Sequence, residues 1–320
     1  MNLLISSNMD SYWNLATEEY LLKNSQEDFI FLYVNKPSVV VGKHQIAQKE
    51  VNSKFINDNN ILVARRLSGG GAVYHDEGNL NISFIQTGKP GENISYKKIT
   101  EIFYHFLNTQ APELGLNERN DFVVNGKKVS GSAMHIFKSR ILAHCTLLVE
   151  CNLTNLSSAL KGHPDRFTDK SISSKRSEVM NLSENSPSVS IEKLIIDFVT
   201  HMKENYAEPT VYELNSIDNE KIQNLATTKY SNINWIYGYS PRYIYRNSIS
   251  FRNAIFHYVL EIDKGIIESV SLDLTHSINT KIELKLNELR GMQHNPQLQI
   301  ELKNAKDFSE IDEIIVSSLL

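Results

Sequence analysis

Three consecutive glycines at residues 69–71 constrain this chain more than any other feature of its sequence. The apolar residues 61–64 before them and the alternating residues 80–85 after them are both predicted as strands. Glycines between strands weaken a sheet, and they are typical of positions where a ligand or another backbone approaches closely. The preceding Arg65 and Arg66 add guanidinium groups, which bind phosphate or carboxylate oxygens. The loop is therefore a candidate anion-binding site.

The spacing of this loop differs from that of the common phosphate-binding loops. Tyr74 occupies the last glycine position of the G-x-G-x-x-G pattern, which excludes a dinucleotide-binding fingerprint. No Gly-Lys-Ser or Gly-Lys-Thr follows, which excludes a Walker A loop. The alternative interpretation is a glycine-rich hairpin with a solvated arginine pair.

Four segments together point to a known family. Residues 65–76 read Arg-Arg-Leu-Ser-Gly-Gly-Gly-Ala-Val-Tyr-His-Asp, which resembles the signature loop of lipoate–protein ligase A. Residues 14–19 resemble the first helix of that family, and residues 120–121 followed by 126–133 resemble its lysine hairpin. Residues 235–238 are similar to the start of its accessory domain, so the resemblance covers nearly the whole chain. It implies an α+β fold: a large mixed-sheet catalytic domain of the biotin/lipoate ligase type with a small α+β C-terminal accessory domain.

The pattern of the first part of the chain is consistent with this expectation. An Asn-Gly pair at residues 125 and 126, between two alternating runs, predicts a β-hairpin over residues 121–129. Residues 152–185 are polar and lack a clear period, and a mobile loop is expected over residues 161–177. Helices are expected from residue 10 or 11 to about 24, over 49–59, from 95, and over 191–205 and 217–228, and strands over 29–34, 39–42 and 141–149.

A second unit is expected to begin near Trp235. Since strands and helices mix without strict alternation, both units are predicted as α+β. The expected division is a catalytic lipoate/ATP-binding domain over residues 1–230 and an accessory domain over residues 235–320. In the second unit we expect strands over residues 243–250, 257–262 and 266–272, and helices within 279–320 around a break at 291–296.

Composition excludes several other classes of protein. The 320 residues suffice for a large and a small domain, and the net charge of −4 argues against nucleic-acid binding. No apolar run reaches the length of a membrane span. Cys145 and Cys151 make neither a disulfide framework nor a zinc quartet, which favours a reducing compartment. The first basic residue is Lys23, so neither a secretory nor a transit signal is expected, and the location is predicted as cytoplasmic.

The resemblance implies a two-step reaction. A lipoate oxygen attacks the α-phosphate of ATP and pyrophosphate leaves, and a lysine amine of a carrier domain then takes the lipoyl group from lipoyl-AMP. Charge that develops at the α-phosphate requires fixed donors, a bridging cation and Mg²⁺. The implied cofactors are ATP and Mg²⁺, with lipoate as substrate. The implied partners are lipoyl domains of 2-oxoacid dehydrogenase E2 subunits and the glycine cleavage H protein, and the chain is expected to act as a monomer.

Lys128 is the implied catalytic residue, because it corresponds to the family lysine that contacts both the acyl carbonyl and the phosphate. Side chains alternate along a strand, so Lys127 is expected on the opposite face. For a hairpin lysine the alternative is a solvated charge. The resemblance assigns Arg66, Gly71, Ala72, Val73, Tyr74, Asp121 and Lys128 to ATP, and Tyr33, Arg66, Ser68, Gly70, His75 and Lys128 to lipoate.

Two of these assignments have alternatives, and a third departs from the family pattern. Asp121 is the expected Mg²⁺ or ribose partner, but an aspartate before a strand is also a common turn residue. His75 is equally consistent with a structural histidine. Tyr33 stands where the family commonly has a tryptophan. The tyrosine keeps an aromatic wall beside the lipoyl tail.

Cys145 raises a second functional reading. Residues 143–148, Ala-His-Cys-Thr-Leu-Leu, resemble the corresponding strand of the lipoyltransferase branch of the family. That branch would move a preformed lipoyl group, from lipoyl-AMP or from a lipoylated carrier, without ATP activation. Residues 173–177 also slightly favour the transferase reading. A cysteine in an apolar strand is usually inert, however. A non-catalytic nucleotide- or lipoate-binding protein is disfavoured by Lys128 together with the full glycine loop.

Overall fold

A mixed six-stranded sheet forms the centre of the larger unit. The computed structural model describes residues 1–88, 95–206, 209–251, 254–272, 280–304 and 309–319. The strand order is β10-β11-β6-β2-β1-β13, with β1 parallel to both of its neighbours and the other pairs antiparallel. The strands are β1 Asn2–Ile5, β2 Phe29–Val34, β6 Asn79–Thr87, β10 Ser130–Phe137, β11 Arg140–Leu148 and β13 Thr210–Val211.

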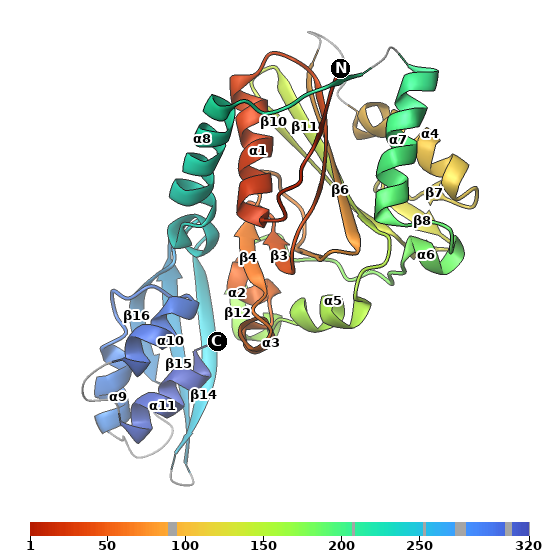
Figure 1. Ribbon diagram of the computed structural model, residues 1–320. Helices are drawn as coiled ribbons and strands as arrows, with labels where there is room; N and C mark the ends of the chain where they lie inside the picture. The colour runs from red at the N-terminus through yellow and green to blue at the C-terminus, as the bar shows by residue number, and fades with distance from the viewer. Residues whose placement is uncertain (89–94, 207–208, 252–253, 273–279, 305–308, 320) are drawn as a thin grey trace.

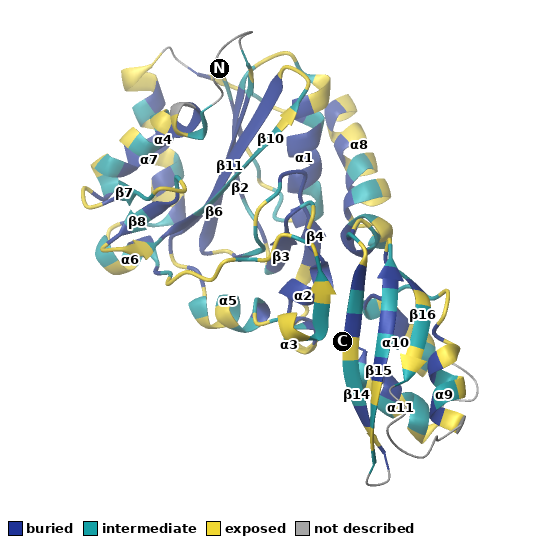
Figure 2. Ribbon diagram, turned by 180° about the vertical axis from the view of Figure 1, so that it is seen from behind, coloured by how far each residue is buried: buried dark blue, intermediate teal, exposed yellow. Residues whose placement is uncertain are grey.

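Helices cover both faces of this sheet (Figure 1). Helix α1, Ser11–Asn24, packs on one face, and its N-terminus is capped by Asp10, which accepts from the Tyr12 amide at 2.7 Å. Helices α4, Tyr96–Gln110, and α7, Ile191–Asn205, pack on the other face. The central strands are therefore buried on both sides, as Figure 2 shows.

Two smaller sheets carry the predicted site. In the first, β3 Ser38–Val41 lies between β4 Leu62–Arg65 and β5 Val73–His75, so the three glycines connect β4 to β5. The second sheet has the strand order β7-β8-β9, with β7 at Gly115–Leu116, β8 at Phe122–Val124 and β9 at Lys127–Lys128. Asn125 and Gly126 between β8 and β9 both have positive φ, 51° and 77°, as a type I′ hairpin turn requires. The predicted hairpin is confirmed.

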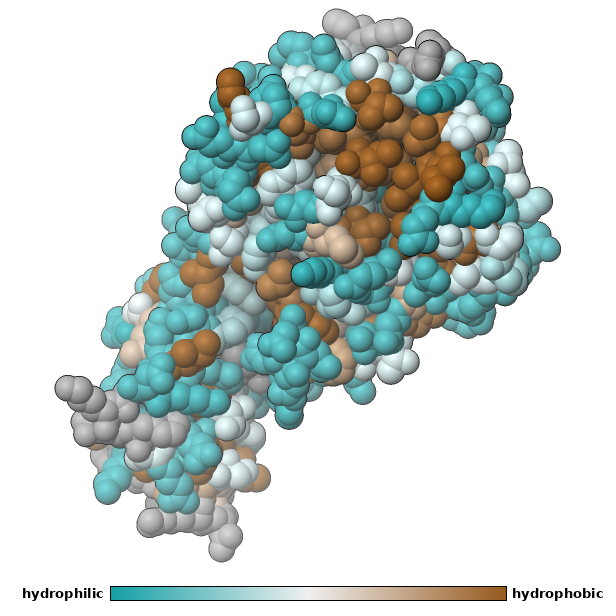
Figure 3. Space-filling view, in the orientation of Figure 1, coloured by the Kyte–Doolittle hydropathy of each residue, from teal (hydrophilic) through white to brown (hydrophobic). Residues whose placement is uncertain are grey.

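The smaller unit is a sheet with the order β12-β14-β15-β16, packed against three helices. Three strands come from the C-terminal part, namely β14 Tyr243–Phe251, β15 Ala254–Asp263 and β16 Ile266–Leu272. Helices α9 Thr280–Asn287, α10 Pro296–Lys303 and α11 Glu310–Ser318 cover it. Its visible face is mostly hydrophilic, whereas hydrophobic side chains gather on part of the larger unit (Figure 3).

Strand β12, Phe167–Asp169, comes from the part of the chain that precedes the smaller unit, yet Phe167 pairs with Tyr245 of β14. The two units thus share a sheet, and the division at residues 230 and 235 stays a prediction. Helix α8, Ser216–Leu225, and two π-helical turns, Ala226–Tyr230 and Asn234–Gly238, connect the units.

The α+β class and most predicted elements are confirmed, but two expectations about local structure are wrong. Residues 49–59 do not form one helix: α2, Ala47–Glu50, ends before α3, Ser53–Asp58. Asn52 breaks the helix because its side chain accepts from the Phe55 amide at 3.1 Å and starts α3 as its N-cap. Residues 152–185, expected to lack a pattern, contain α5 Leu153–Ala159, a 3₁₀ turn Pro164–Arg166, strand β12 and α6 Leu182–Asn185. In the described part of the chain, no helix is long and apolar enough to cross a membrane.

Candidate active site

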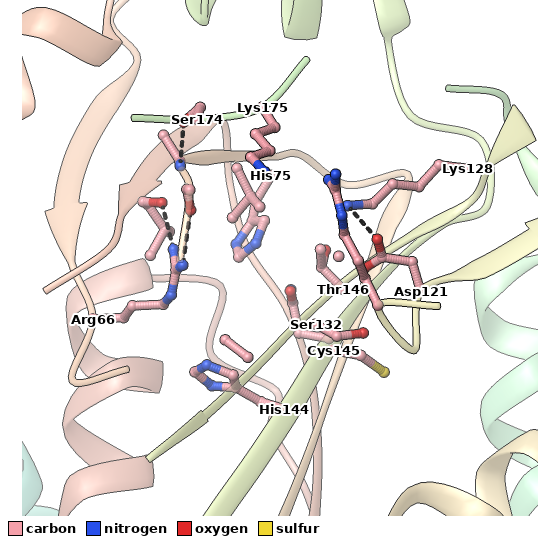
Figure 4. A pocket seen from close by; sticks show the side chains of 18 of the residues that line it. Arg66, His75, Asp121, Lys128, Ser132, His144, Cys145, Thr146, Ser174 and Lys175 are labelled. Atoms are coloured by element: carbon pink, nitrogen blue, oxygen red, sulfur yellow. Dashed lines mark hydrogen bonds and ion pairs between the residues drawn. The ribbon is translucent and has the colours of Figure 1, made fainter. Parts of the chain in front are cut away.

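A cavity of about 370 Å³ brings most of the predicted site residues together. It lies between the glycine loop on one side and the β8–β9 hairpin on the other, so Arg66 and Lys128 flank it (Figure 4). An adjoining cavity of about 510 Å³ shares Ala72, Val73 and Lys128 and adds Tyr74. Of the predicted residues, the first cavity is lined by Tyr33, Arg66, Gly71, Ala72, Val73, His75, Asp121 and Lys128, whereas Ser68 and Gly70 do not belong to its described lining.

Arg66 holds the glycine loop together. Its Nε donates to Ser68 Oγ at 2.9 Å, and its NH1 group donates to the Val40 carbonyl at 3.0 Å. Its NH2 group donates to the carbonyls of Gly69 and Gly71 at 2.6 and 2.8 Å. Burial lowers the pKa of Arg66 to about 10, so the guanidinium is still charged at neutral pH. In this structure Arg66 therefore shapes the loop from behind, in addition to reaching the cavity wall.

The glycine loop is crowded at Gly70, where its backbone meets that of Gly42. Gly70 has a φ of +87°, which side chains other than glycine rarely adopt. A Cβ atom on Gly42 would lie 2.1 Å from the Gly70 carbonyl oxygen, so two glycines are needed where these backbones meet. The glycine run allows a close approach, as predicted from sequence. Part of this approach is made by the protein's own backbone at Gly42.

Ser174 covers the loop from the cavity side. Its Oγ accepts from the Ala72 amide at 2.9 Å and from Gln45 Nε2 at 3.2 Å. Because the Ala72 amide is part of the predicted nucleotide cradle, Ser174 occupies a donor that a phosphate oxygen could use. The segment predicted as a mobile loop therefore lies across the site. Its mobility without ligand stays a prediction.

Lys128 and Asp121 face each other across the hairpin. Lys128 Nζ lies 3.1 Å from Asp121 Oδ2, and both residues line the cavity. Lys127 Nζ instead lies 2.9 Å from Glu178 Oε1, and its side chain is 47% exposed. The predicted alternation of the two lysines is confirmed, because only Lys128 belongs to the described lining of either cavity.

A second buried group of polar residues lies at the opposite end of the cavity. His144 Nδ1 lies 3.0 Å from Glu18 Oε1, and His144 Nε2 lies 2.7 Å from Ser68 Oγ. Burial disfavours the Glu18 carboxylate, but His144 and the hydroxyls of Ser83 and Tyr33 outweigh it and hold the pKa of Glu18 below its ordinary value. Tyr33 donates to Glu18 Oε1 at 3.0 Å, and burial beside that carboxylate raises the pKa of Tyr33 well above its ordinary value.

His75 and Cys145 are both unsuited to proton transfer at neutral pH. His75 accepts at Nδ1 from the side-chain Nδ2 of Asn35 at 2.9 Å, and burial lowers the pKa of His75 to about 3. Burial raises the pKa of the Cys145 thiol to about 12, although it lines the cavity. His75 is therefore neutral, and Cys145 is a protonated thiol and a poor nucleophile.

The donor set suits a cation that is held mainly by a substrate. Among the described residues that line the first cavity, Asp121 is the only one with a carboxylate. In the described part of the chain, no group of three or more His, Cys, Asp or Glu residues could hold a metal ion. Mg²⁺ commonly binds through one or two carboxylates, substrate phosphates and water, so Asp121 fits such an ion when a phosphate is bound.

Sequence reasoning gave no role to Glu18, which contacts His144, or to His144, which lines the cavity. Glu18 and His144 lie inside segments that carried the resemblance, but neither was assigned to the site. A charged residue on the inner side of a helix, or a histidine within a buried strand, could have marked them as candidates. Further lining residues without a predicted role are Arg119, Ser132, Thr146 and Ser174.

This chain is similar to known proteins over most of its length. Residues 10–203 match the family model described as lipoyl protein ligase A/B catalytic domain. Lipoate-protein ligase LplJ of Bacillus subtilis is 37% identical over 264 residues, which cover 81% of this chain and 80% of that protein. Lipoate–protein ligase 1 of Staphylococcus aureus is 36% identical over 277 residues, which cover 85% and 84%.

A solved structure shows that the fold extends over both units. P. falciparum LipL1 in complex with lipoate superposes with a TM-score of 0.63 at 24% identity, and the match covers 99% of this chain and 98% of that one. The smaller unit is therefore part of the shared fold. The match of the catalytic-domain model and the two relatives above 35% identity together show that this chain belongs to the lipoyl protein ligase A/B family.

Proposed function

We propose that this chain is an ATP-dependent lipoate–protein ligase. It activates lipoate with ATP to lipoyl-AMP and transfers the lipoyl group to a lysine of a carrier domain. The observation that carries this proposal is one cavity in which Lys128, Asp121 and the glycine loop meet. Family membership and the relatives named lipoate-protein ligase support it.

The adenylation step uses the two ends of the cavity. A lipoate carboxylate oxygen attacks the α-phosphate, the new P–O bond forms, and the bond to pyrophosphate breaks. Lys128 Nζ stands where an ammonium could bridge the carboxylate and the phosphate, which attracts the two anions to one place. Backbone amides of residues 71–74 and the guanidinium of Arg66 bind and orient the nucleotide. Asp121 would hold Mg²⁺, which supplies positive charge at the phosphates.

The acyl chain is proposed to lie toward Tyr33 and His144. Leu15 and Val40 add apolar wall to the cavity. The predicted lipoate contacts at Tyr33, Arg66 and His75 line the same cavity, whereas Ser68 acts from behind the wall through Arg66 and His144. Gly70 contributes through its backbone conformation.

The transfer step and its setting are proposed from the family. The carrier lysine amine attacks the acyl carbonyl carbon and AMP leaves. We propose lipoyl domains of E2 subunits and the H protein as carriers, a monomeric enzyme, and a cytoplasmic location. The two cysteines are free and buried, which is compatible with a reducing compartment.

The decisive experiment is lipoate-dependent exchange of labelled pyrophosphate into ATP. The ligase proposal predicts exchange that requires both lipoate and Mg²⁺. A purified protein that shows no exchange but lipoylates a carrier domain from supplied lipoyl-AMP would instead be a lipoyltransferase. That alternative is the weaker one, because the two relatives above 35% identity are named lipoate-protein ligases.

A further inference from the structure

Three buried hydrogen bonds join helix α1 to the glycine loop. Glu18 Oε1 on α1 contacts His144 Nδ1 on β11 at 3.0 Å. His144 Nε2 contacts Ser68 Oγ at 2.7 Å, and Ser68 Oγ accepts from Arg66 Nε at 2.9 Å. Each residue in this series is buried.

The first three residues have the connectivity of a Ser-His-acid triad. The surroundings of Ser68 do not suit a nucleophile, however. Its side chain is 0% exposed and does not belong to the described lining of the cavity, so an acyl carbonyl could not reach Oγ. Its oxygen already accepts a hydrogen bond from a guanidinium. The series is better explained as a device that holds residues in place.

With a single proton on the His144 ring, the groups present set the direction of each hydrogen bond. Glu18 is a carboxylate, which only accepts, so the proton between it and His144 lies on Nδ1. In the neutral ring, Nε2 is then an acceptor, and the Ser68 hydroxyl donates to it. This leaves a lone pair of Ser68 Oγ for the Arg66 Nε–H. Glu18 thereby fixes the tautomer of His144, and His144 fixes the orientation of the Ser68 hydroxyl.

Arg66 connects these hydrogen bonds to the backbone of the predicted nucleotide-binding loop. The guanidinium is planar, so a bond at Nε also sets where NH1 and NH2 point. NH2 holds the carbonyls of Gly69 and Gly71, directly before the Ala72 amide. We infer that Glu18 is a positioning residue for adenylation: through His144 and Ser68 it fixes Arg66, and through Arg66 the loop backbone that binds ATP. This inference rests on the proposed function for its kinetic test, but not for its binding test.

The neighbouring Glu19 offers a matched control. It is also a buried carboxylate on α1, but it contacts Lys23 at 2.6 Å, Lys229 at 2.6 Å and Tyr230 Oη at 2.7 Å. None of these three partners belongs to the described lining of the two cavities. Glu19→Gln should therefore lower stability without changing the loop.

A double-mutant cycle tests the series. Loss of a residue that orients a metal ligand typically costs about 10–100-fold, and by analogy Glu18→Gln and Ser68→Ala should each lower kcat/KM for ATP in pyrophosphate exchange by that amount. If Glu18 acts through Ser68, the double variant should be no worse than the poorer single variant. Glu19→Gln should stay within about threefold of the wild type, because it lies outside the coupled residues. Multiplicative effects of the two changes would overturn the inference.

Two further measurements separate the possible failures. Calorimetric binding of MgATP without lipoate should weaken in Glu18→Gln and Ser68→Ala but not in Glu19→Gln. If the wild type binds MgATP but shows no exchange, the proposed function fails, and the binding series alone decides the inference. The ¹⁵N spectrum of ligand-free protein should show His144 protonated at Nδ1 in the wild type and not fixed in Glu18→Gln. A lipoyl group found on Ser68 by mass spectrometry, or unchanged MgATP binding in Glu18→Gln, would overturn the positioning role.

Discussion

Lys128 Nζ lies 3.1 Å from Asp121 Oδ2, at the side of the cavity opposite Arg66 (Figure 4). The Asp121 side chain is 8% exposed and that of Lys128 27%, so the ammonium can still reach a ligand. A carboxylate beside it keeps the lysine positioned before substrates arrive. We propose that substrate anions then take over part of the role of Asp121, which would free one of its oxygens for a cation.

Lys128→Ala should keep the fold but lose adenylation. The side chain lines the cavity and contributes little packing, whereas its charge is proposed to bridge carboxylate and phosphate. Removing one charge-assisted contact at a developing charge typically costs about 10²–10³-fold in rate. Pyrophosphate exchange measures the loss, and circular dichroism checks the fold.

Lys127→Ala is the control for that experiment, because its partner Glu178 lies outside the cavity and is 73% exposed. Exchange should stay within a few-fold of the wild type. Lys128→Arg should restore little, since a planar fork replaces a compact charge. A well-folded Lys128→Ala with near-normal exchange, or an inactive Lys127→Ala, would show that the wrong lysine is assigned.

Asp121→Asn should raise the Mg²⁺ concentration needed for half-maximal exchange. The amide keeps the size of the side chain and can still accept from Lys128, but it is a poorer ligand for a hard cation. A titration of exchange with Mg²⁺ at fixed ATP and lipoate measures the shift. If the half-maximal concentration is unchanged while the maximal rate falls, Asp121 serves only to position Lys128.

The lysine hairpin and the glycine loop could be predicted from sequence because their conformations depend on local chemistry. An Asn-Gly pair specifies a tight turn wherever it occurs between strands, and the alternation of side chains then separates Lys127 from Lys128. The glycine run similarly indicates a crowded backbone, as at Gly70.

The contact between Glu18 and His144 could not be predicted in this way, because 126 residues separate them. Only the packing of α1 on the sheet brings the carboxylate to β11. Strand β12 has the same cause: three residues have no period to detect, and the pairing of Phe167 with Tyr245 defines them. The cover that Ser174 gives to Ala72 also depends on tertiary contacts alone.

Stability should fall as the pH drops below about 6.5, the ordinary pKa of histidine. His75 and His294 are buried with pKa values lowered to about 3 and about 4, so the unfolded state binds protons that the folded state does not. Stability therefore rises with pH between these values and 6.5, by about 1.4 kcal/mol per pH unit for each histidine. Denaturant unfolding of the wild type and His75→Gln from pH 7 to 4.5 measures the slope. The slope should be shallower in the variant, and equal slopes would contradict the lowered pKa of His75.

The segment from residue 161 to 180 should become more resistant to proteolysis when an adenylate is bound. It carries Lys161, Lys175 and Arg176 at the wall of the second cavity, where they could contact phosphate and exclude water. Ser174 Oγ holds it to the Ala72 amide at 2.9 Å, so Ser174→Ala should speed cleavage there. Limited trypsin digestion with mass spectrometry, with and without a non-hydrolysable lipoyl-adenylate analogue, measures both effects.

Ser173→Ala is the matched control, because it is Ser174, the next residue, that accepts the hydrogen bond from the Ala72 amide. Equal cleavage with and without the analogue would mean that the segment is not ordered by the adenylate. If Ser174→Ala and Ser173→Ala are cleaved equally fast, the bond to Ala72 does not hold the segment in place.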